Sequence, residues 1–129
     1  MVIRGLYGAQ LERGLAQFPR ESWLMLNFAE WVRDYQGALD QLTDFLGIHR
    51  FRKYPPLRLN PTPERHEGTP PSEADIDKLV GRYADDLSLF EKLSGFDVSA
   101  WPTRRIAAGE MSPAELAAKF ARKFDDPDD

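Results

Sequence analysis

Residues 72–95 read SEADIDKLVGRYADDLSLFEKLSG, and this stretch decides the fold class. Ser72 followed by Glu73 and Asp75 is a helix-capping signature, and the helix is expected to end near Ser94 and Gly95. Between these ends, apolar residues recur at the spacing of one helix face. They are Ile76, Leu79, Val80, Tyr83, Leu87 and Phe90. The pattern predicts a long amphipathic helix.

Three other segments show helical periodicity, so the chain itself is predicted to be mostly α, with four helices. Pro19 ends the first of the three, and Gly47 is placed to form a left-handed cap at the end of the second. In the third, Ser112, Pro113 and Glu115 stand at the cap, first and third helical positions. The three segments cover 6–18, 35–46 and 112–124, and an acidic tail follows at 125–129.

One strand is predicted, over the continuous apolar run Trp23–Phe28. A run of this length and composition suits a strand that is covered on both faces of a parallel sheet. A single strand cannot satisfy its own backbone N–H and C=O groups. Three interpretations therefore stay open: a fragment of an α/β domain, strand pairing across an oligomer interface, or a buried helical segment with a misleading pattern.

Composition excludes several classes of function. The net charge of −4 argues against a nucleic-acid partner, and the absence of cysteine excludes disulfides and thiol chemistry. His49 and His66 have no ligand-like spacing, so no metal site is expected. No apolar run approaches the ~20 residues of a membrane span, and the N-terminus does not resemble a signal peptide. We expect a soluble, cytoplasmic protein without a membrane partner.

The cationic side chains suggest where an anion would bind. Residues 1–58 carry eight Arg or Lys against six Asp or Glu, whereas 59–129 carry nine against fifteen. The densest cationic group lies in the long loop 49–71, where aromatic residues alternate with it. Arginine can hold a phosphate with two hydrogen bonds, and an aromatic ring can stack on a base, although a solvated loop has the same composition. The residues are Arg50, Phe51, Arg52, Lys53, Tyr54 and Arg58.

Two further side chains are candidates for a site. Glu30 follows the predicted strand, where ligand crevices form in α/β folds, so it could act as a base or orient a cation. The alternative that we favour is a carboxylate stabilising the start of the next helix. Tyr7 could donate a hydrogen bond to a substrate, or it could be a packing residue at the start of the first helix.

Taken in order, these segments resemble the C-terminal portion of sulfotransferases of the P-loop family, which use 3′-phosphoadenosine 5′-phosphosulfate (PAPS). The order and spacing of the motifs carry the resemblance, which covers about residues 4–101. The matching pieces are Arg4-Gly5-Leu6-Tyr7, Gln10-Leu11-Glu12-Arg13, Phe18-Pro19-Arg20-Glu21, the run Trp23–Phe28, Glu30, the segment Leu39–Ile48 with Phe45-Leu46-Gly47, Leu57-Arg58-Leu59-Asn60, and Leu79–Trp101.

The resemblance implies an α/β fold, as part of a three-layer P-loop-type domain, and transfer of a sulfuryl group from PAPS to a hydroxyl or amine. In this family the loop after the matched glycine closes over the PAPS nucleotide. That implies cofactor binding by Arg50, Arg52, Lys53 and Tyr54, and we expect Tyr7 to be substrate-binding. Residues 1–101 would form the sulfotransferase-like region, and 102–129 a helix and tail in the same domain or appended to it.

The chain also departs from the family pattern. The strand–loop–helix that binds the 5′-phosphosulfate is not found in the sequence, and neither are the upstream Arg and Ser that hold the 3′-phosphate. Gly14 stands where the family has a Trp, and the loop after Gly47 has no K-G-x-x-G run. We therefore expect this chain to be incomplete for catalysis, with the other half of the site supplied from elsewhere.

Two other functions remain open from the sequence. The chain could be a non-catalytic helical interaction module, forming a homodimer in which the Trp23–Phe28 strand pairs with its copy. It could also bind the nucleotide without catalysing transfer, through the Arg50–Arg58 loop. The two differ in their expected response to nucleotide.

Overall fold

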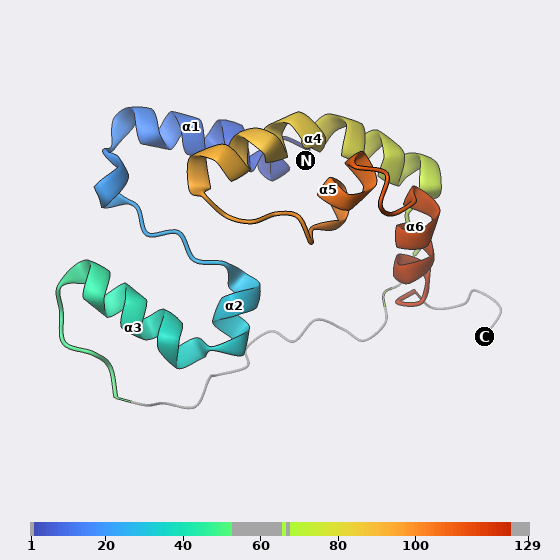
Figure 1. Cartoon of the computed structure of the whole chain (residues 1–129). Coiled ribbons are helices and arrows are strands. Elements are labelled where there is room, and N and C mark those ends of the chain that lie inside the picture. Colours follow the sequence, from blue (N-terminus) through green and yellow to red (C-terminus); the bar gives the residue numbers. More distant parts are fainter. Residues whose placement is uncertain (1, 53–65, 67, 125–129) are drawn as a thin grey trace. The chain divides into compact units, whose positions relative to one another are not determined.

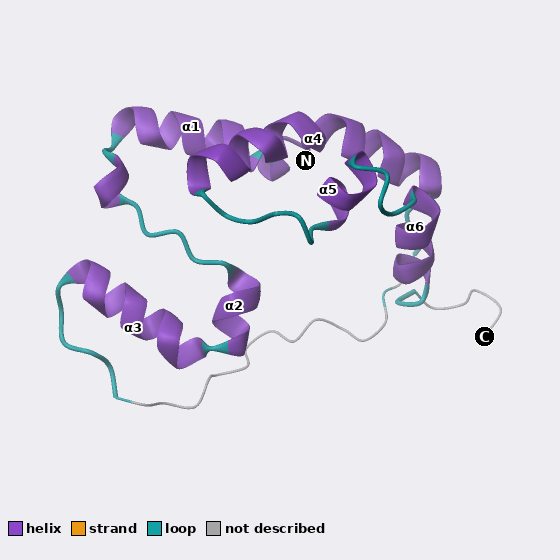
Figure 2. Ribbon diagram, viewed as in Figure 1, coloured by secondary structure: helices purple, strands orange, loops and turns teal. Residues whose placement is uncertain are grey.

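The computed structural model describes residues 2–52, 66 and 68–124, and these are helical with irregular connections (Figure 1). The helices in this part of the chain are η1 (Val2–Gly5), α1 (Tyr7–Gln17), η2 (Arg20–Ser22), α2 (Phe28–Arg33), α3 (Tyr35–Leu46), α4 (Glu73–Ser94), α5 (Pro102–Ala107) and α6 (Pro113–Ala121). None of the described segments is a β-strand (Figure 2). The prediction of a mostly α-helical chain is confirmed.

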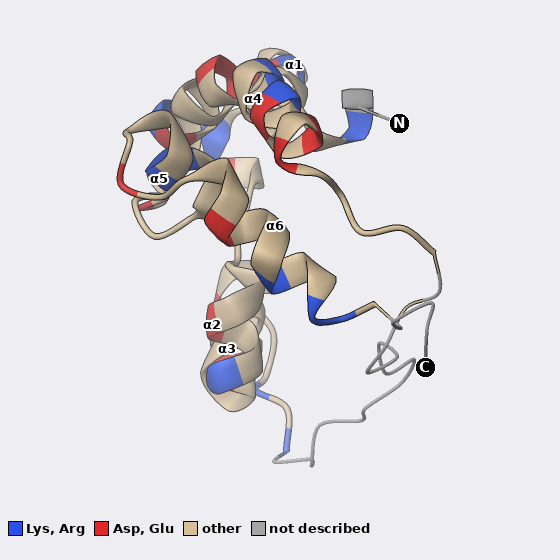
Figure 3. Cartoon of the chain, turned by 90° about the vertical axis from the view of Figure 1, so that its right-hand side faces the viewer, with Lys and Arg blue, Asp and Glu red and all other residues tan. Residues whose placement is uncertain are grey.

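The chain divides into two compact units, and the first is built around α4. This unit combines residues 1–16 with residues 62–129. Helices α5 and α6 both pack against α4, and Arg104 of α5 forms an ion pair with Glu91 of α4. Acidic and basic positions are interspersed along α4 (Figure 3). The apolar side chains buried in this unit are Leu11, Ile76, Leu87, Val98 and Met111.

The ends of α4 lie where the sequence predicts them. The hydroxyl of Ser72 accepts a hydrogen bond from the backbone N–H of Asp75, and the Asp75 carboxylate accepts one from the backbone N–H of Ser72 at 3.0 Å. This capping box satisfies two backbone donors that a helix start leaves without partners. At the other end Gly95 has a φ of 76°, a left-handed conformation that glycine adopts without strain.

The C-terminal helix α6 also begins with a capping box, formed by Ser112 and Glu115. Beyond α6, the backbone N–H of His66 donates a hydrogen bond of 2.7 Å to the carbonyl of Lys123. The ring of His66 lies 5.7 Å from the ring of Phe124, measured between centroids. These contacts tie the end of the long loop to the segment that follows α6.

The second unit, residues 17–61, contains α2 packed against α3. The side chain of Thr43 is fully buried, and its hydroxyl donates to the carbonyl of Asp40 at 2.9 Å. Helix α3 has the predicted bounds and ends at Gly47, which has a φ of 66°. Several large apolar side chains of this unit stay exposed, including Phe28 at 76% and Val32 at 66%.

The predicted strand Trp23–Phe28 is wrong. Residues 23–27 have no regular structure, and Phe28 begins α2, with Asn27 as its cap. The backbone is nevertheless extended at both ends of the segment, where Trp23 has φ −117° and ψ 118° and Asn27 has φ −78° and ψ 121°. A strand needs a neighbour to accept its hydrogen bonds, and the described residues provide none.

Candidate functional site

Arg50, at the start of the predicted cofactor loop, forms ion pairs with two carboxylates of α3. Two nitrogens of the Arg50 guanidinium lie 3.2 Å from Asp40 Oδ2 and 2.9 Å from Asp44 Oδ2. The hydrogen bond to Asp44, with the charges of both carboxylates, raises the pKa of Arg50 above its usual value. Arg50 is therefore placed as an anchor of the loop, with its charge offset by two carboxylates.

The rest of the predicted cofactor site is only partly described. Arg52 is exposed and has no ion pair within the described part of the chain, so its guanidinium faces water. Lys53, Tyr54 and Arg58 lie outside the described residues. Within the described residues, Arg50 is ion-paired with carboxylates of α3 and Arg52 is not.

Glu30 lies in the first turn of α2, whereas the helix-start interpretation placed it before the helix at 35–46. The Asn27 side chain caps this helix by accepting the backbone N–H of Ala29 at 2.9 Å. Negative charge close to a helix N-terminus is stabilising, which gives Glu30 a structural reason to be there. It also lines a shallow depression of about 200 Å³ that includes Trp31 and Asp34.

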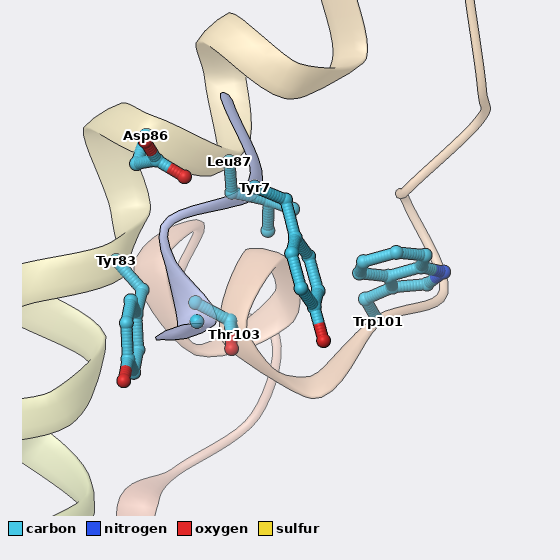
Figure 4. A pocket seen from close by; sticks show the side chains of 7 residues that line it. Tyr7, Tyr83, Asp86, Leu87, Trp101 and Thr103 are labelled. Atoms are coloured by element: carbon cyan, nitrogen blue, oxygen red, sulfur yellow. The ribbon is translucent and has the colours of Figure 1, made fainter. Parts of the chain in front are cut away.

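Tyr7 lines a cavity of about 210 Å³ in the first unit (Figure 4). The residues around this Tyr7 pocket come from the start of the chain, from α4 and from the beginning of α5 with the residue before it. They are Gly5, Tyr7, Tyr83, Asp86, Leu87, Trp101 and Thr103. Three of the seven lining residues carry aromatic rings, namely Tyr7, Tyr83 and Trp101.

Phe90 fixes two of these rings. Its ring centroid lies 5.9 Å from that of Tyr7 and 5.9 Å from that of Trp101. It also makes an edge contact with Phe96 at 5.9 Å. Tilted aromatic pairs at such distances contribute beyond the area they bury. The Tyr7 and Trp101 rings are thus held by a common neighbour.

Two glycines bring the start of the chain against α4. A Cβ placed on Gly5 would lie 2.8 Å from the Tyr83 ring, and one on Gly8 would meet the α4 backbone at Asp86 and Phe90. The close approach lets the Asp86 carboxylate accept the backbone N–H groups of Gly8 and Ala9, both at 2.8 Å. Asp86 thereby satisfies two donors at the start of α1.

The candidate residues are divided between the two units. Tyr7 belongs to the first unit, and Arg50 and Arg52 belong to the second. Sequence reasoning missed Asp86, Gly8 and Thr103. The three-residue spacing of Gly5 and Gly8 was a signal for close backbone packing, but the partner helix lies too far along the chain for a local pattern to identify it.

The described residues show neither a metal site nor a membrane-spanning helix, and the chain matches none of the known proteins compared with it. The described residues contain no group of three or more metal-ligating side chains, and their helices include none that is long and apolar enough to cross a membrane. No protein-family model matches the chain, and no curated protein or solved structure shows significant similarity to it.

Proposed function

We propose that this chain is the C-terminal region of a PAPS-dependent sulfotransferase and that the segment after Gly47 binds the nucleotide part of the cofactor. In the complete protein, the sulfuryl group of PAPS passes to a hydroxyl or amine acceptor, leaving 3′-phosphoadenosine 5′-phosphate. The phosphosulfate-binding loop and the sheet of the α/β domain are then supplied by another part of the protein or by a partner chain.

The segment 23–27 is the observation that carries this proposal. It is extended at both ends, it is apolar, and the backbone N–H groups of Leu24, Met25 and Leu26 have no hydrogen-bond partner in the described part of the chain. A strand taken out of its sheet has these properties. The segment is followed by Glu30 and by a helix that ends at Gly47, in the order of the sulfotransferase motifs.

Within the loop, the proposal gives Arg50 and Arg52 different tasks. Arg50 holds the start of the loop on α3 through Asp40 and Asp44. Arg52 is the exposed cation that meets a phosphate, because it forms no ion pair with the carboxylates of the described residues. Lys53 and Tyr54 complete the group as a second cation and a ring for the adenine.

The first test is a thermal-shift titration with 3′-phosphoadenosine 5′-phosphate. A ligand that binds only the folded protein raises its apparent stability, so we expect the melting temperature to rise by several degrees. The rise should disappear in an Arg52→Ala/Lys53→Ala variant. The matched control is Arg122→Ala/Lys123→Ala, which removes two adjacent positive charges from the first unit and should keep the full response.

Each outcome decides something about the nucleotide loop. A shift that is lost in the loop variant and kept in the control supports binding by this segment. Equal loss in both variants would mean that only the net charge matters. A folded wild-type protein without any shift at millimolar nucleotide would reject nucleotide binding by this chain.

A second candidate function, a helical interaction module, is favoured by the exposed apolar surface of residues 17–61. Phe28, Val32 and Leu46 are 76%, 66% and 54% exposed, although each is large and apolar. Phe28 and Val32 are four residues apart on α2 and share one face of that helix, and an exposed apolar face of this kind can serve as a contact site. In this candidate a second copy of the chain covers the surface, and residues 23–27 pair across the dimer.

Light scattering during size-exclusion chromatography tests the second candidate. A homodimer of the wild-type chain that a Phe28→Asp variant converts to monomer would support it. The control is Phe120→Asp, a change at an exposed phenylalanine of the first unit, which should leave the mass unchanged. A monomeric wild-type protein across the concentration range would reject it.

A further inference from the structure

The Tyr7 pocket has opposing aromatic walls. In Figure 4, Tyr83 stands on one side, Tyr7 and Trp101 stand on the other, and Thr103 lies between them. The Tyr83 ring packs over the backbone of Gly5, and Phe90 holds the other two rings. The aromatic side chains on both sides of the pocket are therefore held by neighbouring residues.

The charge in the pocket is already balanced. Asp86 is the one ionisable carboxylate in its lining, and its two oxygens accept the backbone N–H groups of Gly8 and Ala9. The positive end of α1 offsets the negative charge of this carboxylate. A cationic ligand therefore finds no unpaired anion in the pocket, and an anionic ligand finds no cationic side chain in the lining.

The pocket volume sets the size of the ligand. An apolar cavity of roughly 150 Å³ is enough to bind benzene. At about 210 Å³ this pocket has room for one ring or a fused pair, and it is too small for a nucleotide. The hydroxyl of Thr103 is a donor and an acceptor for one polar group on the ring.

We propose that the Tyr7 pocket binds an uncharged planar aromatic ligand carrying one hydroxyl or similar polar group, of the size of phenol to indole. The ring lies in the pocket against the Tyr7–Trp101 pair, and its polar group hydrogen-bonds to Thr103. This site lies wholly in the first unit, and it does not rest on nucleotide binding by the loop of the second unit.

The test is a titration of the isotopically labelled whole chain with phenol, followed by two-dimensional NMR of the backbone amides. We expect saturable shifts confined to residues around 5–8, 83–87 and 101–103. Benzoate has the same ring with a charge, and cyclohexanol has the same hydroxyl without a planar ring. Both should bind more weakly than phenol.

Three variants test whether phenol binds in the Tyr7 pocket. Thr103→Val keeps the side-chain shape and removes the hydroxyl, so phenol affinity should fall about fivefold, the value of one hydrogen bond. Trp101→Leu removes a ring and should weaken binding about tenfold. Trp31→Leu, in the other unit, is the control and should bind as the wild type does.

The same spectra report whether each variant is folded. If Trp101→Leu does not fold, the Thr103→Val variant carries the test, because it leaves the volume of the pocket unchanged. Shifts that do not saturate, that spread over both units, or that are the same in Thr103→Val and the wild type would overturn the proposal.

Discussion

Asp86 accepts a hydrogen bond from the backbone N–H of Gly8 at 2.8 Å, across 78 residues of sequence. The other carboxylate oxygen of Asp86 accepts the N–H of Ala9 at the same distance. A side chain of α4 thus takes the place of the local cap that most helices carry in their own sequence. The start of α1 therefore depends on a contact with a distant helix.

Replacing Asp86 should destabilise the chain. Asp86→Ala leaves two backbone donors of α1 without partners, so we expect the free energy of unfolding to fall by about 1 to 2 kcal/mol. Asp86→Asn keeps one acceptor and should cost less. Urea denaturation followed by circular dichroism measures the change. Asp85→Ala, at the exposed neighbouring position, is the control, and an equal loss there would contradict the capping role.

Alanine should have opposite effects at Gly8 of α1 and Gly81 of α4, both of which lie within helices. In an exposed helix interior, glycine to alanine stabilises by about 1 kcal/mol. Gly81 of α4 has open space around the position of a Cβ, so Gly81→Ala should raise the melting temperature. A Cβ at Gly8 would lie 2.9 Å from the backbone nitrogen of Phe90, so Gly8→Ala should lower it. A gain in both variants would contradict the close packing of α1 on α4.

Acid should weaken the two capping boxes. The hydroxyl of Ser72 donates to Asp75 and lowers the pKa of that carboxyl below 3.8, and the backbone N–H of Ser112 lowers the pKa of Glu115 below 4.5. Because folding lowers both pKa values, the stabilisation is present above these ordinary values and is lost as the pH falls through the lowered ones.

Urea midpoints measured from pH 7 to pH 2 test this behaviour. Part of the loss of stability below pH 4.5 should be absent from an Asp75→Asn/Glu115→Gln variant, whose boxes no longer carry titrating groups. Ser72→Ala removes the main donor to Asp75. It should also reduce the loss of stability below pH 4.5, but by less than the double variant does. Identical pH profiles for the double variant and the wild type would disprove the linkage.

The two described arginines of the loop should contribute unequally to nucleotide binding. The charge of Arg50 is offset by Asp40 and Asp44, whereas Arg52 has no ion pair in the described part of the chain. Arg52→Ala should therefore weaken binding of 3′-phosphoadenosine 5′-phosphate more than Arg50→Ala, as measured by calorimetry. A larger loss of affinity in Arg50→Ala than in Arg52→Ala would instead assign phosphate binding to Arg50.

Helix ends were predictable from the sequence because their signals are local. Ser72, Gly47 and Gly95 each act on backbone groups within a few residues, and all three have the predicted role. The short helices α2 and α5 were not predicted, because six residues are too few to show a period of 3.6. The strand prediction for residues 23–28 was wrong because a strand needs a neighbouring strand, and a local apolar pattern carries no information about whether one is present.

The candidate site was less predictable. Tyr7 was a candidate from the sequence and Asp86 was not, because nothing near Asp86 in the sequence indicates that α1 begins beside it. Arg50 was grouped with Arg52 by composition, and only the three-dimensional positions of Asp40 and Asp44 separate their roles. Long-range contacts thus distinguish residues that look equivalent in sequence.

The contact between Gly8 and Asp86 also sets an order of events during synthesis. Helix α1 has eleven residues, and an isolated helix of that length is only marginally stable in water. At roughly 5 to 20 residues per second, a ribosome needs about 4 to 16 seconds to add the 78 residues that separate the two contact positions. During that interval α1 lacks the cap that Asp86 provides. Residues 17–61 are synthesised in the same interval and can fold before α1 is capped.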